Sequence, residues 1–303
     1  MKLALGPLLY YWPRQHVLDF YADIVERAVD CVYLGETVCS RRHELRLEDW
    51  FEVAALLASA GKEVVLSTQG LIESESDLKT MRRIIRHCAA SDGKLRVEAN
   101  DMGAVRLLGE AGARDWVAGP TLNLFNPHSL QLMRDAGATR WAVAPEMAGT
   151  AIASVRAALA TPIETEVFAY GRLPLAHSAR CFTARHFNLQ KDSCEFRCLS
   201  IMDGITLRTR EGEPFLTLNG VQTQSARVHN LLADLPSVAG TAEVLRISPQ
   251  GEHTSTIIEL FRAVLDTELS ADAALDASRE RMPAAPCNGF WHGVAGAEQF
   301  VAA

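Results

Sequence analysis

Residues 18–35, "LDFYADIVERAVDCVYLG", combine a helix pattern with a strand pattern that follows it directly. The apolar residues of the first part recur at the spacing of a helix with one buried face, at Leu18, Tyr21, Ile24, Val25 and Ala28. The run CVYL at 31–34 is short and continuously apolar, which is typical of a strand buried on both faces. This stretch therefore predicts a helix packed against a parallel β-sheet, as in an α/β protein.

The same alternation continues along most of the chain. Four glycines follow helical patterns, where a left-handed cap favours glycine: Gly61, Gly93, Gly112 and Gly137. Eight strand–helix units in about 250 residues predict a (β/α)8 TIM-type barrel that forms a single domain over residues 1–303. A doubly wound open sheet is the alternative, but no G-x-G-x-x-G follows the first strand. The predicted strands are 2–10, 31–34, 63–67, 95–98, 116–118, 140–144, 163–169 and 243–247.

The alternation stops after the seventh predicted strand. Residues 171–225 contain no clear amphipathic helix and carry three of the seven cysteines. Connections in barrels are normally short, and long ones are commonly functional. We therefore predict a cysteine-bearing insertion after the seventh strand.

The composition is that of a well-packed globular protein, with 48% hydrophobic and 22% charged residues. The formal net charge of −7 argues against nucleic acid as the main partner, because phosphate binding needs a basic surface. No run reaches the roughly 18 apolar residues that a transmembrane helix needs. We expect a cytoplasmic protein whose cysteines serve metal binding or redox chemistry rather than disulfide bonds.

Three cysteines of the insertion, Cys181, Cys194 and Cys198, have the spacing C-x12-C-x3-C. A tetrahedral metal site or an iron–sulfur cluster needs four such ligands, so one more thiol is required. The loops that follow the strands of a barrel meet at one end. Cys39 follows the second strand and the insertion leaves the seventh, so Cys39 is the predicted fourth ligand.

The other cysteines fit this site less well. Cys31 begins a buried strand, and Cys88 lies in an apolar helix stripe, so both are expected in the core. Cys287 follows the last helix and has no predicted place.

The spacing alone leaves both zinc and an iron–sulfur cluster open. Zinc sites of four cysteines usually consist of two close pairs, and here only Cys194 and Cys198 form such a pair. A cluster tolerates dispersed ligands and is favoured for that reason. The radical-enzyme triplet C-x3-C-x2-C is absent, so cleavage of S-adenosylmethionine is not indicated.

Polar residues near the cysteines and at strand ends are further candidates for the site. His177, Arg180, Arg185 and Glu36 are the catalytic candidates. His177 could exchange a proton near neutral pH, and the two arginines could offset the charge of a thiolate-ligated cluster or bind an anionic substrate. Each is also compatible with a surface or supporting role. The other strand-end candidates are Thr68, Gln69, Asn100, Asp101, Asn123 and Glu146.

Two segments near the end of the chain also carry candidates. Arg246 and Ser248 end the last predicted strand, where "SPQG" could bind an anion through backbone N–H groups. Asn288 and Trp291 are expected to cover the barrel mouth.

A series of familiar segments is distributed along nearly the whole chain: LGPLLYYWP (5–13), YLGETVCSRR (33–42), GKEVVLST (61–68), YGRLPLAHSARCFTAR (170–185), CEFRC (194–198), LNGVQT (218–223), VLRISPQG (244–251) and CNGFWH (287–292). In this order they resemble bacterial members of the collagenase-like peptidase family. The stretch around Cys181 is the most specific.

The resemblance implies a barrel with a [4Fe–4S] cluster held by Cys39, Cys181, Cys194 and Cys198. It implies a heterodimer with a paralogue, UbiU, that hydroxylates the ubiquinone ring without O2 in anaerobic biosynthesis. The implied substrate is a ubiquinone precursor with an isoprenoid tail, served by a lipid-binding accessory protein of the UbiT type. Relatives that hydroxylate tRNA suggest prephenate as the oxygen donor.

Peptidase activity is not expected despite the name of the family. The sequence has no H-E-x-x-H, no G-x-S-x-G and no Cys–His–Asn order that forms a triad. A cysteine held by iron also cannot act as a nucleophile. A different class of function stays open: a non-catalytic partner subunit whose metal site, cluster or zinc, is structural and which stabilises or regulates UbiU. The small number of acid/base candidates favours that alternative.

Overall fold

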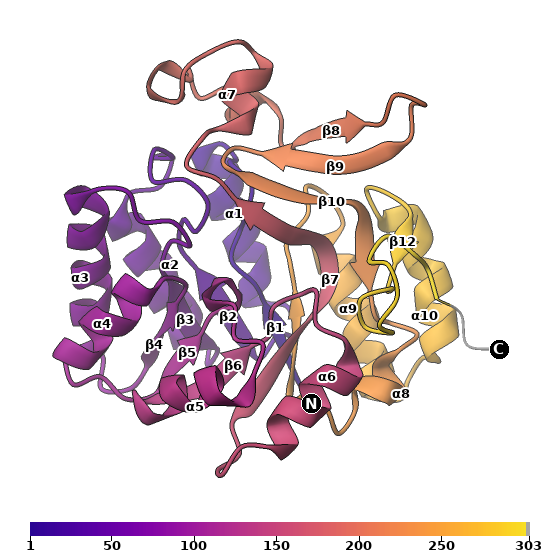
Figure 1. Cartoon of the computed structure of the whole chain (residues 1–303), viewed down its shortest axis with the longest axis horizontal. Helices are drawn as coiled ribbons and strands as arrows, with labels where there is room; N and C mark the ends of the chain where they lie inside the picture. Colours follow the sequence, from indigo (N-terminus) through magenta and orange to yellow (C-terminus); the bar gives the residue numbers. More distant parts are fainter. Residues whose placement is uncertain (301–303) are drawn as a thin grey trace.

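Eight strands pair in parallel and close into a ring in this computed structural model, which describes residues 1–300 (Figure 1). The ring closes because β11 pairs with both β7 and β1, which confirms the predicted (β/α)8 barrel. In the order in which they pair, the barrel strands are β1 (Lys2–Leu5), β2 (Cys31–Leu34), β3 (Glu63–Ser67), β4 (Leu95–Ala99), β5 (Trp116–Ala118), β6 (Ala138–Ala142), β7 (Glu164–His177) and β11 (Val244–Ile247).

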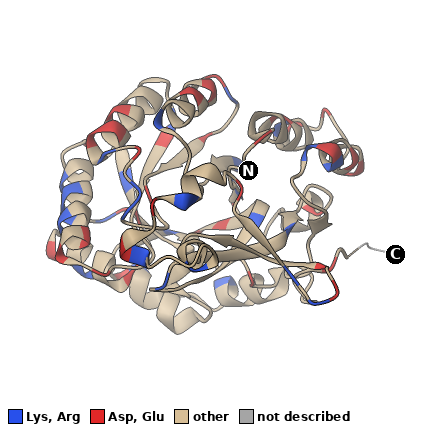
Figure 2. Cartoon of the chain, turned by 90° about the horizontal axis from the view of Figure 1, so that it is seen from above, with Lys and Arg blue, Asp and Glu red and all other residues tan. Residues whose placement is uncertain are grey.

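Helices surround the ring, and basic and acidic residues are interspersed over their outer faces (Figure 2). Gly61, Gly93, Gly112 and Gly137 all have positive φ angles, as predicted for helix caps. No helix within residues 1–300 is both long and apolar enough to span a membrane. The helices are α1 (Arg14–Val25), α2 (Leu47–Ser59), α3 (Glu75–Ala89), α4 (Met102–Glu110), α5 (Pro127–Asp135), α6 (Gly149–Ala157), α7 (Phe182–His186), α8 (Leu235–Val238), α9 (Thr254–Leu265) and α10 (Ala271–Ser278).

Three predicted strands have wrong boundaries. The sixth lies at Ala138–Ala142, two residues before its predicted range of 140–144. The first ends at Leu5 and does not continue to Tyr10, because Pro7 has no N–H to donate to a ladder. The seventh continues beyond Ala169 to His177, because its second half pairs with a strand outside the barrel. The strands 31–34, 63–67 and 116–118 lie where they were predicted.

The cysteine-bearing segment forms an antiparallel extension above the ring (Figure 1). It begins within β7 and returns within β10, so residues 171–225 overlap both strands. Between β7 and β11 the chain has only the short helices α7 and α8, with two 3-10 turns at Lys191–Ser193 and Arg197–Ser200. The strands are β8 (Ile205–Arg208), β9 (Pro214–Asn219) and β10 (Gln222–Asn230), and β12 (Pro286–Cys287) pairs with β10.

Charged side chains fill the lower part of the barrel interior. The fully buried Arg140 of β6 lies 2.8 Å from Glu63 and 2.7 Å from Glu164, and its Nη1 donates to the Tyr33 hydroxyl at 3.0 Å. Lys2 lies 3.0 Å from Glu164. Burial disfavours the ionised form of Glu63 and Glu164, but the attraction of the Arg140 guanidinium is stronger than this effect. The pKa of both carboxyl groups is therefore lowered.

The same network continues upward to the mouth of the barrel. Arg246 of β11 donates to Glu166 at 2.5 Å and to Glu98 at 2.7 Å, and its guanidinium lies 4.1 Å from the centre of the Tyr33 ring. The Tyr33 hydroxyl donates to Glu166, and the amide of Asn100 donates to Glu98 at 3.0 Å. Arg246, which ends the last predicted strand, is thus paired with carboxylates inside the barrel.

We predict that Arg140→Met destabilises the fold by about 3–5 kcal/mol, because removing one partner leaves buried carboxylates uncompensated. Urea unfolding of both proteins measures the difference. The matched control is Arg106→Met, whose exposed pair with Glu110 should contribute less than about 1 kcal/mol. Equal losses in the two variants would contradict the importance of the interior network.

Candidate functional site

The four predicted cysteine ligands line one small cavity. Cys39 comes from the loop after β2, and Cys181 is the N-cap residue of α7, where its sulfur accepts from the Ala184 N–H at 3.4 Å. Cys194 and Cys198 come from the short turns that follow. Cys31, Cys88 and Cys287 are buried away from this cavity.

The sulfur atoms surround the cavity rather than meet at one point. Within the part of the chain that the structure describes, no three His, Cys, Asp or Glu side chains are close enough to hold a single metal ion. A zinc ion needs four sulfurs at about 2.3 Å from one centre. A cubane cluster holds its thiolates farther apart, so the arrangement of these donors favours a cluster over a single zinc ion. Their role as ligands stays a prediction.

Basic side chains line the cysteine cavity together with the thiols: Arg41, Arg42, Lys191 and Arg197. They are not the ones that were predicted for this role. Arg180 and Arg185 are exposed and do not line the cavity. Each of the four cations also has a carboxylate partner outside the lining: Asp192 for Arg41, Glu36 for Arg42, Glu73 for Lys191 and Glu195 for Arg197.

Arg42 joins three segments at this cavity. Its Nη1 donates to the carbonyl of Leu9 at 2.7 Å and its Nη2 to Oδ1 of Asn219 at 2.7 Å. The Asn219 side chain donates to the same Leu9 carbonyl at 2.8 Å. Gly220 follows with φ of 64°, and a Cβ there would lie 3.0 Å from Arg42, so this close approach favours glycine.

Glu36 shapes the loop that carries Cys39. Its carboxylate accepts from the N–H groups of Val38 at 2.9 Å and Cys39 at 3.0 Å, and it lies 3.7 Å from Arg42. Burial raises the pKa of Glu36, although Arg42 and the two N–H groups oppose that effect. This predicted catalytic candidate therefore has a positioning role in the observed geometry.

Burial also raises the pKa of two cavity thiols. The pKa of Cys39 is about 11, and that of Cys198 is raised although Arg42 opposes the shift. The thiolate is the metal ligand, so binding of a metal or cluster would release protons from these groups.

A second cavity lies at the mouth of the barrel. The hydroxyls of Thr37 and Ser248 face no hydrogen-bond partner within residues 1–300, although both side chains are buried. Buried hydroxyls without partners are rare and favour a ligand or water at this place. Polar side chains that line this mouth cavity are Thr37, Glu98, Asn100, Thr121, His177, Gln222, Arg246 and Ser248.

His177 is the catalytic candidate that does line the mouth cavity. Its Nε2 lies 3.2 Å from Nε2 of Gln222. Burial lowers the pKa of His177, so the ring is neutral at pH 7 and can accept from the Gln222 amide. Sequence reasoning missed Gln222 and Thr37, although both lie in the familiar segments LNGVQT and YLGETVCSRR.

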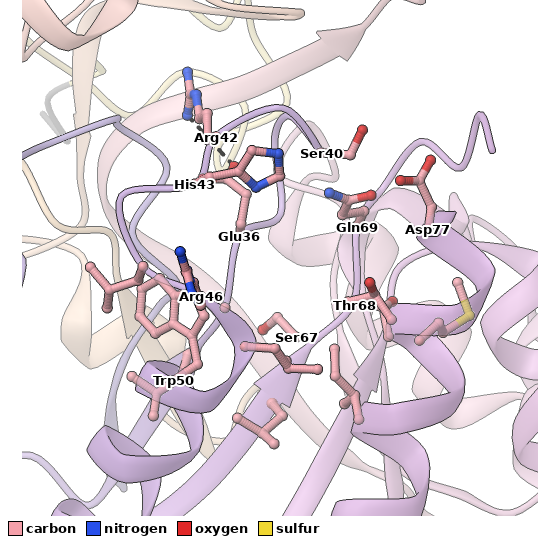
Figure 3. Close-up of a pocket in the computed structure, with 18 of the residues that line it drawn as sticks. Glu36, Ser40, Arg42, His43, Arg46, Trp50, Ser67, Thr68, Gln69 and Asp77 are labelled. Carbon is pink, nitrogen blue, oxygen red and sulfur yellow. Dashed lines mark ion pairs between the residues drawn. The ribbon is translucent and has the colours of Figure 1, made fainter. Parts of the chain in front are cut away.

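Several other candidates have structural roles. Asp101 caps α4, and Asn123 adopts a left-handed conformation after a 3-10 turn. Thr68 accepts from the Asn100 N–H at 2.9 Å. Trp291 packs against Gly149 and donates a hydrogen bond to Ser237, and Asn288 donates one to Asp234. Neither residue lines the mouth cavity, so the expectation that they cover the barrel mouth was wrong. Gln69 lines a crevice between α2 and α3 (Figure 3), and Glu146 is exposed, with a pKa raised by partial desolvation.

The mouth cavity and the cysteine cavity are neighbours. Leu9, Val38 and Val221 form a small apolar cluster against which Cys39 and Cys181 pack. Leu9 also lines the mouth cavity. A thin apolar partition therefore separates the thiols from the place where the barrel would bind a ligand.

Residues 18–285 match the family model described as peptidase family U32. The chain belongs to this family. The matched segment contains all four cysteines of the cavity. Among solved structures, the U32 peptidase Mk0906 has 15% identity and a TM-score of 0.48, covering 83% of this chain and 94% of that one. Dihydropteroate synthase from Thermus thermophilus has 12% identity and a TM-score of 0.44, covering 88% and 93%. Likenesses at this level add nothing to the assignment of function.

We predict that alkylation of Cys39 by iodoacetamide accelerates about tenfold per pH unit between pH 8 and 10, because only the thiolate reacts. Because the pKa of Cys39 is raised to about 11, few of its thiol groups are ionised at pH 8, and the alkylation rate keeps rising with pH through this range. Mass spectrometry of labelled peptides from metal-free protein measures the rate, and circular dichroism checks that the fold persists. The alkylation rate of glutathione in the same samples should level off near the ordinary pKa of a thiol. If the Cys39 rate levels off at the same pH, Cys39 is not in a buried environment that raises its pKa.

Proposed function

We propose that this U32 family protein is a [4Fe–4S] subunit of an O2-independent hydroxylase in anaerobic ubiquinone biosynthesis, acting as UbiV does. The observation that carries the proposal is the meeting of Cys39, Cys181, Cys194 and Cys198 at one cavity lined by basic side chains. The segment resemblance along the chain supplies the identity of the pathway. In this proposal, residues 1–303 act as one domain in the cytoplasm.

A bound cluster would transfer electrons or activate an oxygen donor other than O2. The chain's own residues provide the surroundings for that chemistry. Arg42 and the other cavity cations would offset the negative charge, and Leu9, Val38 and Val221 would keep water from the side that faces the mouth.

The mouth cavity is the proposed place for the substrate ring. Thr37 and Ser248 offer unpartnered hydroxyls, and the neutral His177 can hold or accept a proton from a phenolic substituent. Arg246 is already paired with Glu98 and Glu166, so it offers little charge to a dicarboxylate. Prephenate as the oxygen donor therefore stays an expectation from the resemblance alone.

The insertion is the proposed contact surface for the paralogue UbiU. Four large apolar side chains are exposed on or near it: Phe187, Phe196, Leu207 and Phe215. Exposed apolar side chains gathered in one region favour a protein partner. A UbiT-like accessory protein would deliver the precursor with its isoprenoid tail.

A non-catalytic partner subunit is the second candidate function, with a structural cluster or zinc and a role in stabilising or regulating UbiU. The composition of the mouth cavity favours it. Of the titratable groups there, Glu98 and Arg246 are paired with each other, which leaves His177 as the acid/base group among the lining residues.

We predict about four iron and four sulfide per chain in protein purified without air, as a cubane requires. Cys39→Ala should lose the cluster, because three ligands leave one iron labile. Cys88→Ala is the matched control and should keep the cluster at a stability loss of about 1 kcal/mol. Iron and sulfide assays with absorption spectra measure both. One tightly bound zinc in place of iron would refute the cluster.

We predict that a strain carrying Cys194→Ala makes ubiquinone in air but not without O2, and lacks hydroxylated intermediates only in the second condition. Quinone extraction from both cultures measures this. Normal anaerobic quinone levels, with the UbiU complex still formed in a pull-down, would support the structural alternative. A defect of equal size in air would contradict an oxygen-independent role.

A further inference from the structure

A line of hydrogen-bonded side chains connects the cysteine cavity with the mouth cavity. Arg42 lines the first cavity, His177 and Gln222 line the second, and Asn219 lies between them. Gln222 begins β10, where it lies opposite Asn219 of β9 on one side and His177 of β7 on the other. Cross-strand neighbours share one face of a sheet, so these three side chains meet. Arg42, Asn219 and Gln222 are buried, which shields their hydrogen bonds from water.

Arg42 fixes the orientation of the Asn219 amide. A guanidinium has only donors, and Nη2 of Arg42 lies 2.7 Å from Oδ1 of Asn219. On the other side of the amide, Nδ2 donates at 2.8 Å to the backbone carbonyl of Leu9, which can only accept. Turning the amide over would place donor against donor and oxygen against oxygen at these two contacts. Nδ2 of Asn219 is therefore the atom that faces Gln222.

Asn219 in turn orients the Gln222 amide. Nδ2 of Asn219 donates to Oε1 of Gln222 at 3.3 Å, and Nε2 of Gln224 donates to the same oxygen at 2.9 Å. Because both donors lie on its oxygen, Gln222 turns its NH2 group to His177, whose Nε2 lies 3.2 Å away. An imidazole nitrogen that accepts from an N–H group carries no proton. The proton of the neutral ring is then on Nδ1.

The opposite end of the line is less decisive. The Tyr10 hydroxyl lies 3.1 Å from Oε1 of Gln224 and 3.2 Å from Oε1 of Gln250. Its single proton can serve either oxygen, so this end does not dictate which way the Gln224 amide lies. Reversing the amides of Gln224 and Gln222 together would set two NH2 groups against each other at Asn219. The orientation is therefore decided at the guanidinium end.

We propose that Gln222 is a positioning residue that holds His177 in the Nδ1–H tautomer, so that the ring offers a hydrogen-bond donor to an oxygen atom in the mouth cavity. Nδ1 has no hydrogen-bond partner within residues 1–300, and it is not sealed in the core as Nδ1 of His229 is. The unpartnered hydroxyls of Thr37 and Ser248 line the same cavity. Of the two roles proposed for His177, to hold a proton or to accept one, this tautomer supports the first. That the oxygen belongs to a quinone precursor rests on the proposed function; the tautomer does not.

The first test reads the tautomer by nitrogen NMR of the full-length protein, labelled with 15N-histidine, at neutral pH. The 15N shifts of an imidazole separate a protonated from an unprotonated nitrogen, and a His177→Gln variant identifies the signals of this ring among the nine histidines. The parent protein should show an unprotonated Nε2 and a protonated Nδ1, the opposite of the tautomer that free histidine favours. A protonated Nε2 in the parent protein would overturn the proposal.

The second test reverses the contact without changing the size of the side chain. In Gln222→Glu, one carboxylate oxygen keeps the two donors that the amide oxygen had, and the other faces Nε2 of His177 in place of an N–H group. Nε2 should therefore become protonated. Gln190→Glu adds the same charge at an exposed position outside the mouth lining and should leave the ring unchanged, as should Tyr10→Phe. An unprotonated Nε2 in Gln222→Glu, or a changed tautomer in either control, contradicts the role of Gln222.

A cell-based assay reports on the proposed function separately. If the Nδ1 proton serves a quinone precursor, a strain carrying Gln222→Glu should make less ubiquinone without O2 by about tenfold or more, while the iron content of the purified variant stays that of the parent. Normal quinone levels together with the expected spectra would remove the role in hydroxylation and keep the tautomer. The two proposals can therefore fail independently.

Discussion

The ion-paired network of Arg140, Tyr33, Glu166 and Arg246 is the constraint on which the barrel depends. Barrel interiors are commonly filled by layers of branched aliphatic side chains. Here the interior carries opposite charges that must all be matched, because an unmatched buried charge costs several kcal/mol. A slip of one residue in any of these strands would turn its charged side chain toward the helices. The network therefore favours one register and fixes Glu98 and Arg246 as the floor of the mouth cavity.

The loop after β2 lies between three neighbouring cavities and contributes side chains to each of them. Thr37 faces the mouth, Cys39 faces the cysteine cavity, and Glu36 borders the crevice between α2 and α3. Arg42 lines both the cysteine cavity and the crevice, and it holds the loop to Leu9. One short segment thus lines all three cavities. Glu36 and Arg42 both hold this loop, Glu36 through the N–H groups of Val38 and Cys39 and Arg42 through Leu9 and Asn219.

The sequence predicted the barrel because parallel strands buried on both faces form continuous apolar runs, as in CVYL at 31–34. It also placed Cys39 with the three insertion cysteines, since loops at one end of a barrel must meet. It did not predict Arg140 inside the ring, because a charged residue in a strand pattern is normally taken as exposed. The cavity cations Arg41 and Arg42 were missed for another reason: side-chain direction in an irregular loop follows no period.

The position of Cys39 so far from its partners has a consequence for biosynthesis. A ribosome adds residues at about 5–20 per second, so Cys39 is made on the order of 10–30 s before Cys198. During that interval the first strands of the barrel can form while the cavity has only one of its four thiols. The quartet is complete only after the insertion has returned through Asn219 to meet Arg42. Any machinery that loads metal would therefore encounter a nearly finished barrel, not an unfolded chain.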